Sequence, residues 1–200
     1  GSDKPVLVSE MDSWGQFPLI VREVVDHLNA DYSVWSVGAA GDTAENMVFG
    51  EIERGETEYM LALDKQRDKV KGFVFSAAGN DIIGEDPATG RPVIEDLILQ
   101  FNGDPTDVDG HINHDLLQDK LDFLQDAYEK VIGTIRADAD FKTLPIFIHG
   151  YDYPFPYPWT HDNRKPKHAD KDKWLGKPFT VRGIQDRNLR RGILKVFINR

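Results

Sequence analysis

The sequence predicts an α/β protein in which a parallel sheet carries helices on both faces. Short apolar runs typical of buried strands alternate with longer segments whose apolar residues recur at three and four positions. The order strand, helix, strand, helix, strand, helix, strand favours a parallel sheet, because parallel neighbours need a crossover helix between them. The 200 residues suit a single domain over 1–200.

Four apolar runs are the expected strands: 5–9 (PVLVS), 32–37 (YSVWSV), 72–77 (GFVFSA) and 144–149 (LPIFIH). The first run is followed at once by polar residues, so we expect a buried strand that ends in a surface turn. The second run leads into a turn of glycine and alanine, whose small side chains permit close backbone approach.

Helical periodicity joins these strands. Apolar residues form one buried helix face over 17–30, 56–67 and 115–136, and a last helix is expected over 186–200. Two long connections, 85–114 and 150–182, interrupt the pattern. Loops of this length usually carry function, and in open parallel sheets the ligand crevice lies at the carboxyl ends of the strands.

Composition and charge exclude several classes of function. The net charge of −10 argues against nucleic acid as a partner, since phosphate binding needs a positive field. Basic residues predominate from residue 136 onward, where a solvated surface is a simpler interpretation than an anion-binding one. The absence of cysteine excludes disulfides and a thiol nucleophile. No run approaches the ~18 apolar residues of a membrane span. Compartment and oligomeric state stay open.

Three short polar motifs follow the first three strands: DSW at 12–14, GDT at 41–43 and GND at 79–81. Because the carboxyl ends of parallel strands meet at one edge of a sheet, we expect these motifs to converge. Acyl transfer needs a nucleophilic hydroxyl and donors for the developing oxyanion. Ser13 supplies the hydroxyl, and its own N–H, the Gly41 N–H and the Asn80 amide supply the donors.

These motifs resemble those of the SGNH, or GDSL-like, serine hydrolases. The resemblance implies a three-layer α/β/α fold with a flavodoxin-like parallel sheet, and an esterase or lipase that needs no metal or organic cofactor. It assigns the catalytic roles to Ser13, Gly41 and Asn80. The segment 149–154 (HGYDYP), together with Pro158-Trp159 and Trp174-Leu175, is similar to a bacterial subgroup of the family.

Two features depart from the family pattern. Met11 stands where the first motif usually has a glycine, which would crowd the turn that presents Ser13. Family members also carry a D-x-x-H sequence after a fifth strand, with the His as base, and none occurs in these 200 residues. We therefore expect the domain to be truncated before its C-terminal strand and catalytic-histidine segment.

Four further residues have two interpretations each. Asp12 is either a supporting catalytic group or a turn residue or helix cap, and Asp81 is more simply a structural partner for the loops. His149 is the substitute base if the chain is complete, although a substrate-binding or structural role is favoured. Tyr151 opens an aromatic and proline-rich run that either lines an acyl or sugar pocket or packs as a lid.

The remaining histidines predict no metal site. His111 and His114 form an H-x-x-H pair in an Asp-rich loop, but no third ligand stands at helical spacing, so a surface loop is favoured. His161 and His168 lie in a lysine-rich segment and are expected to be solvated.

The expected function is therefore hydrolysis of an O-acyl ester on a lipid, carbohydrate or small metabolite through an acyl-Ser13 intermediate. One alternative is a non-catalytic domain of the same fold that binds an acylated or glycan ligand. Another is an unrelated flavodoxin-like protein that binds a flavin or a nucleotide.

Overall fold

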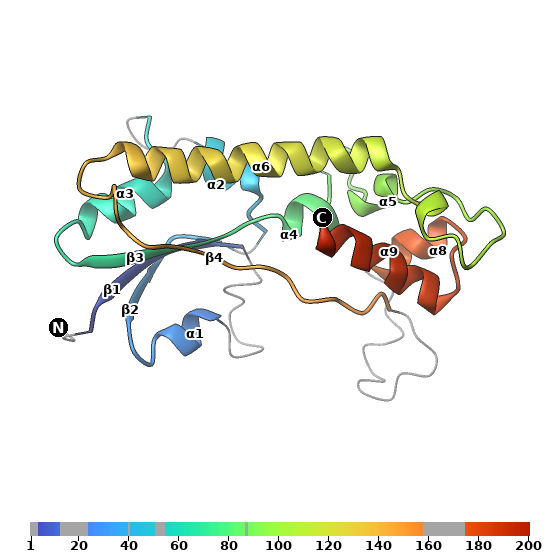
Figure 1. The fold of residues 1–200 in the computed structure, drawn as a ribbon, viewed down its shortest axis with the longest axis horizontal. Helices are drawn as coiled ribbons and strands as arrows, with labels where there is room; N and C mark the ends of the chain where they lie inside the picture. Colours follow the sequence, from blue (N-terminus) through green and yellow to red (C-terminus); the bar gives the residue numbers. More distant parts are fainter. Residues whose placement is uncertain (1–3, 13–23, 40, 51–54, 87, 158–174) are drawn as a thin grey trace. The chain divides into compact units, whose positions relative to one another are not determined.

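The structure is a computed structural model that describes residues 4–12, 24–39, 41–50, 55–86, 88–157 and 175–200 (Figure 1). These residues form two compact units. The first comprises Gly1–Asp81 and Phe123–Gly150, and the second comprises Ile82–Asp122 and Tyr151–Arg200. A single domain over 1–200 stays a prediction.

The first unit is built on a parallel sheet of four strands, β1 (Val6–Met11), β2 (Ser33–Ser36), β3 (Val70–Ser76) and β4 (Ile146–Ile148). Their order is β2-β1-β3-β4, and every neighbouring pair is parallel. The chain leaves β1 toward one side to form β2 and then crosses to the other side to form β3. The carboxyl end of β1 is therefore a topological switch point, where open α/β sheets hold their ligands.

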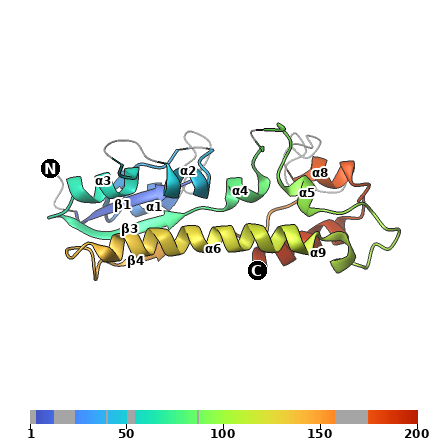
Figure 2. The same cartoon turned by 90° about the horizontal axis from the view of Figure 1, so that it is seen from above.

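Helices cover both faces of this sheet, which confirms the predicted three-layer α/β/α fold. On one face, α1 (Val24–Leu28) packs Val25 against apolar side chains of β1 and β3. On the other face lie α2 (Ala44–Phe49), α3 (Glu58–Lys65) and the C-terminal part of α6 (His114–Ala137). The two views place α3 and that part of α6 next to each other (Figures 1 and 2).

Aromatic rings hold the second of these faces together. The Tyr59 ring of α3 lies 5.7 Å from the Phe73 ring, and the Tyr128 ring of α6 lies 4.9 Å from the Phe75 ring. Both phenylalanines belong to β3 and are buried. Aromatic pairs of this kind remove apolar surface from water and favour particular ring geometries. These two contacts therefore hold α3 and α6 against the sheet.

The first strand is longer than predicted. We expected it to end at Ser9 and to be followed by a polar turn, but β1 continues through Met11. Glu10 pairs with Phe75 and Met11 pairs with Ser76, so the longer neighbour β3 extends the ladder by two residues. The prediction of a turn at Glu10 is wrong, and this carboxyl is buried.

The second unit is helical. It contains α5 (Ile94–Leu97), the short 3₁₀ helix η1 (Asp109–His111), α8 (Gly176–Val181) and α9 (Arg187–Asn199), and α4 (Gly79–Ile83) begins in the first unit. The Asp186 carboxylate caps α9 by accepting from the N–H groups of Asn188 and Leu189, both at 2.8 Å. Its core is formed by buried aliphatic and aromatic residues: Ile94, Leu97, Ile98, Ile112, Leu117, Phe179, Ile184, Leu189, Ile193 and Leu194.

Within the described ranges, no helix is long and apolar enough to cross a membrane.

Candidate active site

The ends of β1, β2 and β3 meet closely. The Asp12 N–H donates to the Ser76 carbonyl oxygen at 3.2 Å, and the Asp12 side chain is fully buried. After β2, Gly38 lies so close to β1 that a Cβ on it would stand 2.0 Å from the Met11 carbonyl oxygen, so only glycine fits there. Ser13 follows Asp12 directly, but it lies outside the described residues.

The second and third predicted motifs are in direct contact. The Asn80 Nδ2 group donates to the Asp42 carbonyl oxygen at 2.8 Å, which fixes the plane of the Asn80 amide. Gly41 has a φ of +96°, a conformation that glycine adopts without strain. The Asp42 carboxylate accepts from the Ala39 N–H at 2.6 Å and closes the same turn. The structure thus brings the turn that contains Gly41 next to the first turn of α4, which carries Asn80.

Asp81 ties the G-N-D motif to the start of α2. Its two carboxylate oxygens accept from the Ala44 N–H at 3.1 and 2.9 Å, and its side chain is buried. Thr43 caps the same helix by accepting from the Asn46 N–H at 3.2 Å. Asp81 therefore serves the loop structure, and its carboxylate is engaged by the backbone.

The turn between β3 and Asn80 is strained. Ala78 has a φ of +105°, a left-handed value that side chains with a Cβ rarely adopt. Just before it, the Tyr128 hydroxyl accepts from the Ala77 N–H at 3.1 Å and donates to the Ala77 carbonyl oxygen at 2.9 Å. Non-glycine residues in such conformations persist only where the surroundings enforce them, and they gather at functional sites.

Glu10 is a buried acid that the sequence analysis missed. Its side chain is 1% exposed, and among the described residues its Oε2 atom has no hydrogen-bond partner. Burial, and then the negative charges of Glu58 and Asp42, raise the pKa of Glu10 from 4.5 to about 8. The carboxyl is therefore neutral at pH 7, three positions before Ser13.

Replacing Glu10 by Gln should remove a loss of stability at alkaline pH. In the folded protein Glu10 keeps its proton up to about pH 8, whereas the unfolded chain releases it near 4.5. Stability therefore falls as pH rises through that window, by at most ~1.4 kcal/mol per pH unit. Thermal unfolding from pH 5 to pH 9 should show Glu10→Gln matching wild type at pH 5 and exceeding it at pH 9. The exposed Glu45→Gln is the control, and parallel curves for Glu10→Gln and wild type would contradict the assignment.

His149 stands at the carboxyl end of β4. Its N–H donates to the Phe75 carbonyl oxygen at 3.2 Å, and its Nδ1 atom lies 3.1 Å from the Ser76 hydroxyl. Ser76 ends β3 and is fully buried, so this contact fixes the imidazole ring at the rim. The sequence analysis missed Ser76, which lay inside an apolar run. Tyr151 belongs to the second unit and is partly buried there.

Comparison with known proteins adds no family to this geometry. No family model matches the chain, and no curated protein matches it. Function must therefore be inferred from the residues themselves.

The two histidines of the H-x-x-H pair are engaged by neighbouring groups, His111 at the end of η1 and His114 at the start of α6. His111 is fully buried, and its Nε2 atom accepts from the Asn102 N–H at 3.1 Å. Its Nδ1 atom contacts the Asp107 carbonyl oxygen, and His114 pairs with Asp109 at 3.0 Å. A surface position is thus wrong for His111, because these backbone contacts hold its ring inside the second unit. Within the described parts of the chain no three metal-ligating side chains are grouped. His161 and His168 lie outside those parts.

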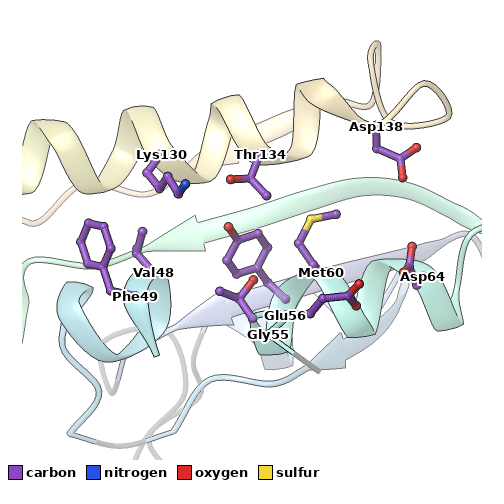
Figure 3. Close-up of a pocket in the computed structure, with 11 residues that line it drawn as sticks. Val48, Phe49, Gly55, Glu56, Met60, Asp64, Lys130, Thr134 and Asp138 are labelled. Atoms are coloured by element: carbon purple, nitrogen blue, oxygen red, sulfur yellow. The ribbon is translucent and has the colours of Figure 1, made fainter. Parts of the chain in front are cut away.

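A groove of about 490 Å³ lies between α3 and α6 in the first unit (Figure 3). Tyr59 and Met60 line it from α3, and Lys130 and Thr134 line it from α6. Its acids Asp64 and Asp138 both pair with Arg67, whose contact to Asp138 is 2.8 Å. None of the predicted site residues that the structure describes lines the groove, and two of the acids lining it, Asp64 and Asp138, are engaged by Arg67, while Glu56 also lines it. The chemistry is therefore better sought at the rim.

Proposed function

We propose that this chain is a serine esterase domain of the SGNH type, with Ser13 as nucleophile and Gly41 and Asn80 as donors to the oxyanion. The single observation that supports this most is the hydrogen bond from Asn80 Nδ2 to the Asp42 carbonyl oxygen. It joins the G-N-D residues at the start of α4 to the G-D-T turn after β2, and β1, the strand before Ser13, lies between β2 and β3. Two motifs far apart in the chain thus lie together at one edge of the sheet, where β1, the strand that precedes Ser13 in the sequence, also ends.

The proposed reaction is acyl transfer in two steps. The Ser13 hydroxyl oxygen attacks the ester carbonyl carbon, the alcohol leaves with a proton, and water then hydrolyses the acyl-serine. The carboxamide nitrogen of Asn80 carries two protons, of which one is bonded to Asp42. The other proton serves the oxyanion, and an amide already fixed in place loses little energy to reorganisation during the reaction.

The hydroxyl proton of Ser13 needs an acceptor. Family resemblance assigns this role to the histidine of a D-x-x-H sequence, which residues 1–200 do not contain. His149 is the histidine that the described residues place at the rim, where Ser76 contacts its Nδ1 atom. The substrate class is an O-acyl ester of a lipid, a carbohydrate or a small metabolite.

Labelling with a fluorophosphonate tests the proposal. A primed serine should give a single adduct in the intact mass, and peptide mapping should place it on Ser13. Hydrolysis of p-nitrophenyl acetate should fall in proportion to the labelled fraction. A chain that takes no label, yet retains an acylated oligosaccharide or a fatty acyl ester in equilibrium dialysis, would instead be a non-catalytic binding domain.

A further inference from the structure

One side chain, that of Tyr128 on α6, forms hydrogen bonds with both backbone groups of Ala77. Ala77 is fully buried and follows the last residue of β3. Both its N–H and its carbonyl oxygen bond to the Tyr128 hydroxyl of α6, at 3.1 and 2.9 Å. Buried backbone groups need hydrogen-bond partners. The Tyr128 hydroxyl provides them for Ala77, one residue beyond the end of the β3 ladder.

The next residue carries the strain. Ala78 has a φ of +105°, a conformation that is sterically unfavourable for a residue with a Cβ. Neighbouring residues must therefore enforce it. The Tyr128 side chain is in turn held firmly, because its ring meets the Phe75 ring edge-on at 72°. Leu124 and Val131, each about one turn away on α6, are buried.

The strained residue leads directly to the predicted oxyanion donor. After Ala78 the chain enters α4 at Gly79, and Asn80 donates from that first turn to the Asp42 carbonyl oxygen. Any relaxation of φ at Ala78 would swing this start of α4 away from the loop that carries Gly41. The Asn80 amide therefore depends on the backbone at residues 77 and 78.

We propose that Tyr128 is a positioning residue for the oxyanion site: by bonding both backbone groups of Ala77 it enforces the left-handed turn at Ala78 and so sets the position of the Asn80 amide. The inference rests on the proposed function and adds a residue to it. Burial, and then the charges of Asp12 and Asp81, raise the pKa of Tyr128, so the hydroxyl keeps its donor proton at neutral pH.

Tyr128→Phe tests the inference by removing one oxygen atom. Fluorophosphonate labelling and kcat should fall by roughly 10-fold to 10²-fold with KM little changed, since the loss is one of alignment. In NMR spectra the Asn80 side-chain amide signals should shift, and hydrogen exchange at residues 77–81 should quicken. Adding Ala78→Gly should restore much of the rate, because glycine adopts this φ unaided. Tyr59→Phe, which removes the hydroxyl of a buried tyrosine on the same face of the sheet, should leave the rate unchanged.

The readouts separate this inference from the proposed function. If wild type takes no label, the esterase proposal fails, while the Asn80 signals and the exchange still test the positioning role. If wild type is labelled and Tyr128→Phe matches it, or loses rate with unshifted Asn80 signals, the inference is overturned. If Tyr128→Phe does not fold, hydrogen exchange of the Ala77 amide is measured in the wild-type protein instead. Fast exchange of this amide would show that the Tyr128 hydroxyl does not hold the turn, and would overturn the inference.

Discussion

Replacing Ser13 by Ala should abolish fluorophosphonate labelling and lower ester hydrolysis by at least about 10⁴-fold, because the proposed acyl intermediate forms on the Ser13 hydroxyl. KM for any residual reaction should stay near the wild-type value. The measurement is the rate of p-nitrophenyl acetate hydrolysis, together with the intact mass after labelling.

The matched control is Ser9→Ala, on the strand that leads to Ser13. Ser9 is fully buried, and its hydroxyl has no hydrogen-bond partner among the residues that the structure describes, so its loss should change neither labelling nor folding. Ser13→Cys adds a positive test, because the chain has no other cysteine and a single thiol can be followed by alkylation. Equal turnover in wild type and Ser13→Ala would rule out this nucleophile.

Replacing Asn80 by Ala should lower kcat by roughly 10²-fold to 10³-fold with a small change in KM, which is the effect that loss of one oxyanion donor has in acyl-transfer enzymes. The donor acts on charge that develops only in the transition state, so the loss should appear in kcat. The variant also loses the hydrogen bond to Asp42, so the free energy of unfolding should fall by about 1 kcal/mol.

Stability and catalysis can be separated with two further variants. Asn46→Ala removes an exposed carboxamide from α2 and should leave kcat unchanged. Asn80→Asp keeps the shape of the side chain but replaces the donor nitrogen by an oxygen, so it should lose as much kcat as Asn80→Ala. If Asn80→Asp retained wild-type turnover, donation from this position would play no part in the reaction.

The sheet and the long helices could be predicted because their patterns are periodic. The apolar stripe over 115–136 matches α6 within two residues, and the run over 144–149 contains β4. The helices α2, α4, α5 and α8 were missed. Each has four to six residues, too few for a repeat of 3.6 to be seen, and contacts such as that of Asp81 with Ala44 define their ends.

At the site, polar motifs at strand ends could be predicted, but polar groups inside apolar patterns could not. Gly41 and Asn80 could be predicted because each follows a strand, and in the structure a hydrogen bond joins the turn after β2 to the first turn of α4. Glu10 directly follows an apolar run, so the sequence pattern predicts a turn there. Its place in β1 depends on pairing with the longer strand β3, which the local sequence does not reveal. Tyr128 fitted the apolar stripe of its helix, where a hydroxyl that bonds a distant backbone cannot be told from an ordinary core contact.

The position of β4 at the end of the strand order has a consequence for handling the protein. One side of this three-residue strand pairs with β3, and no described strand pairs with its other side. Phe147 and Ile148 on it are 54% and 55% exposed. Backbone donors and acceptors beside bare apolar side chains form a template for strand addition, which is how edge strands start aggregates. Concentrated solutions of this chain are therefore at risk of edge-to-edge association, which charged substitutions at Phe147 should suppress.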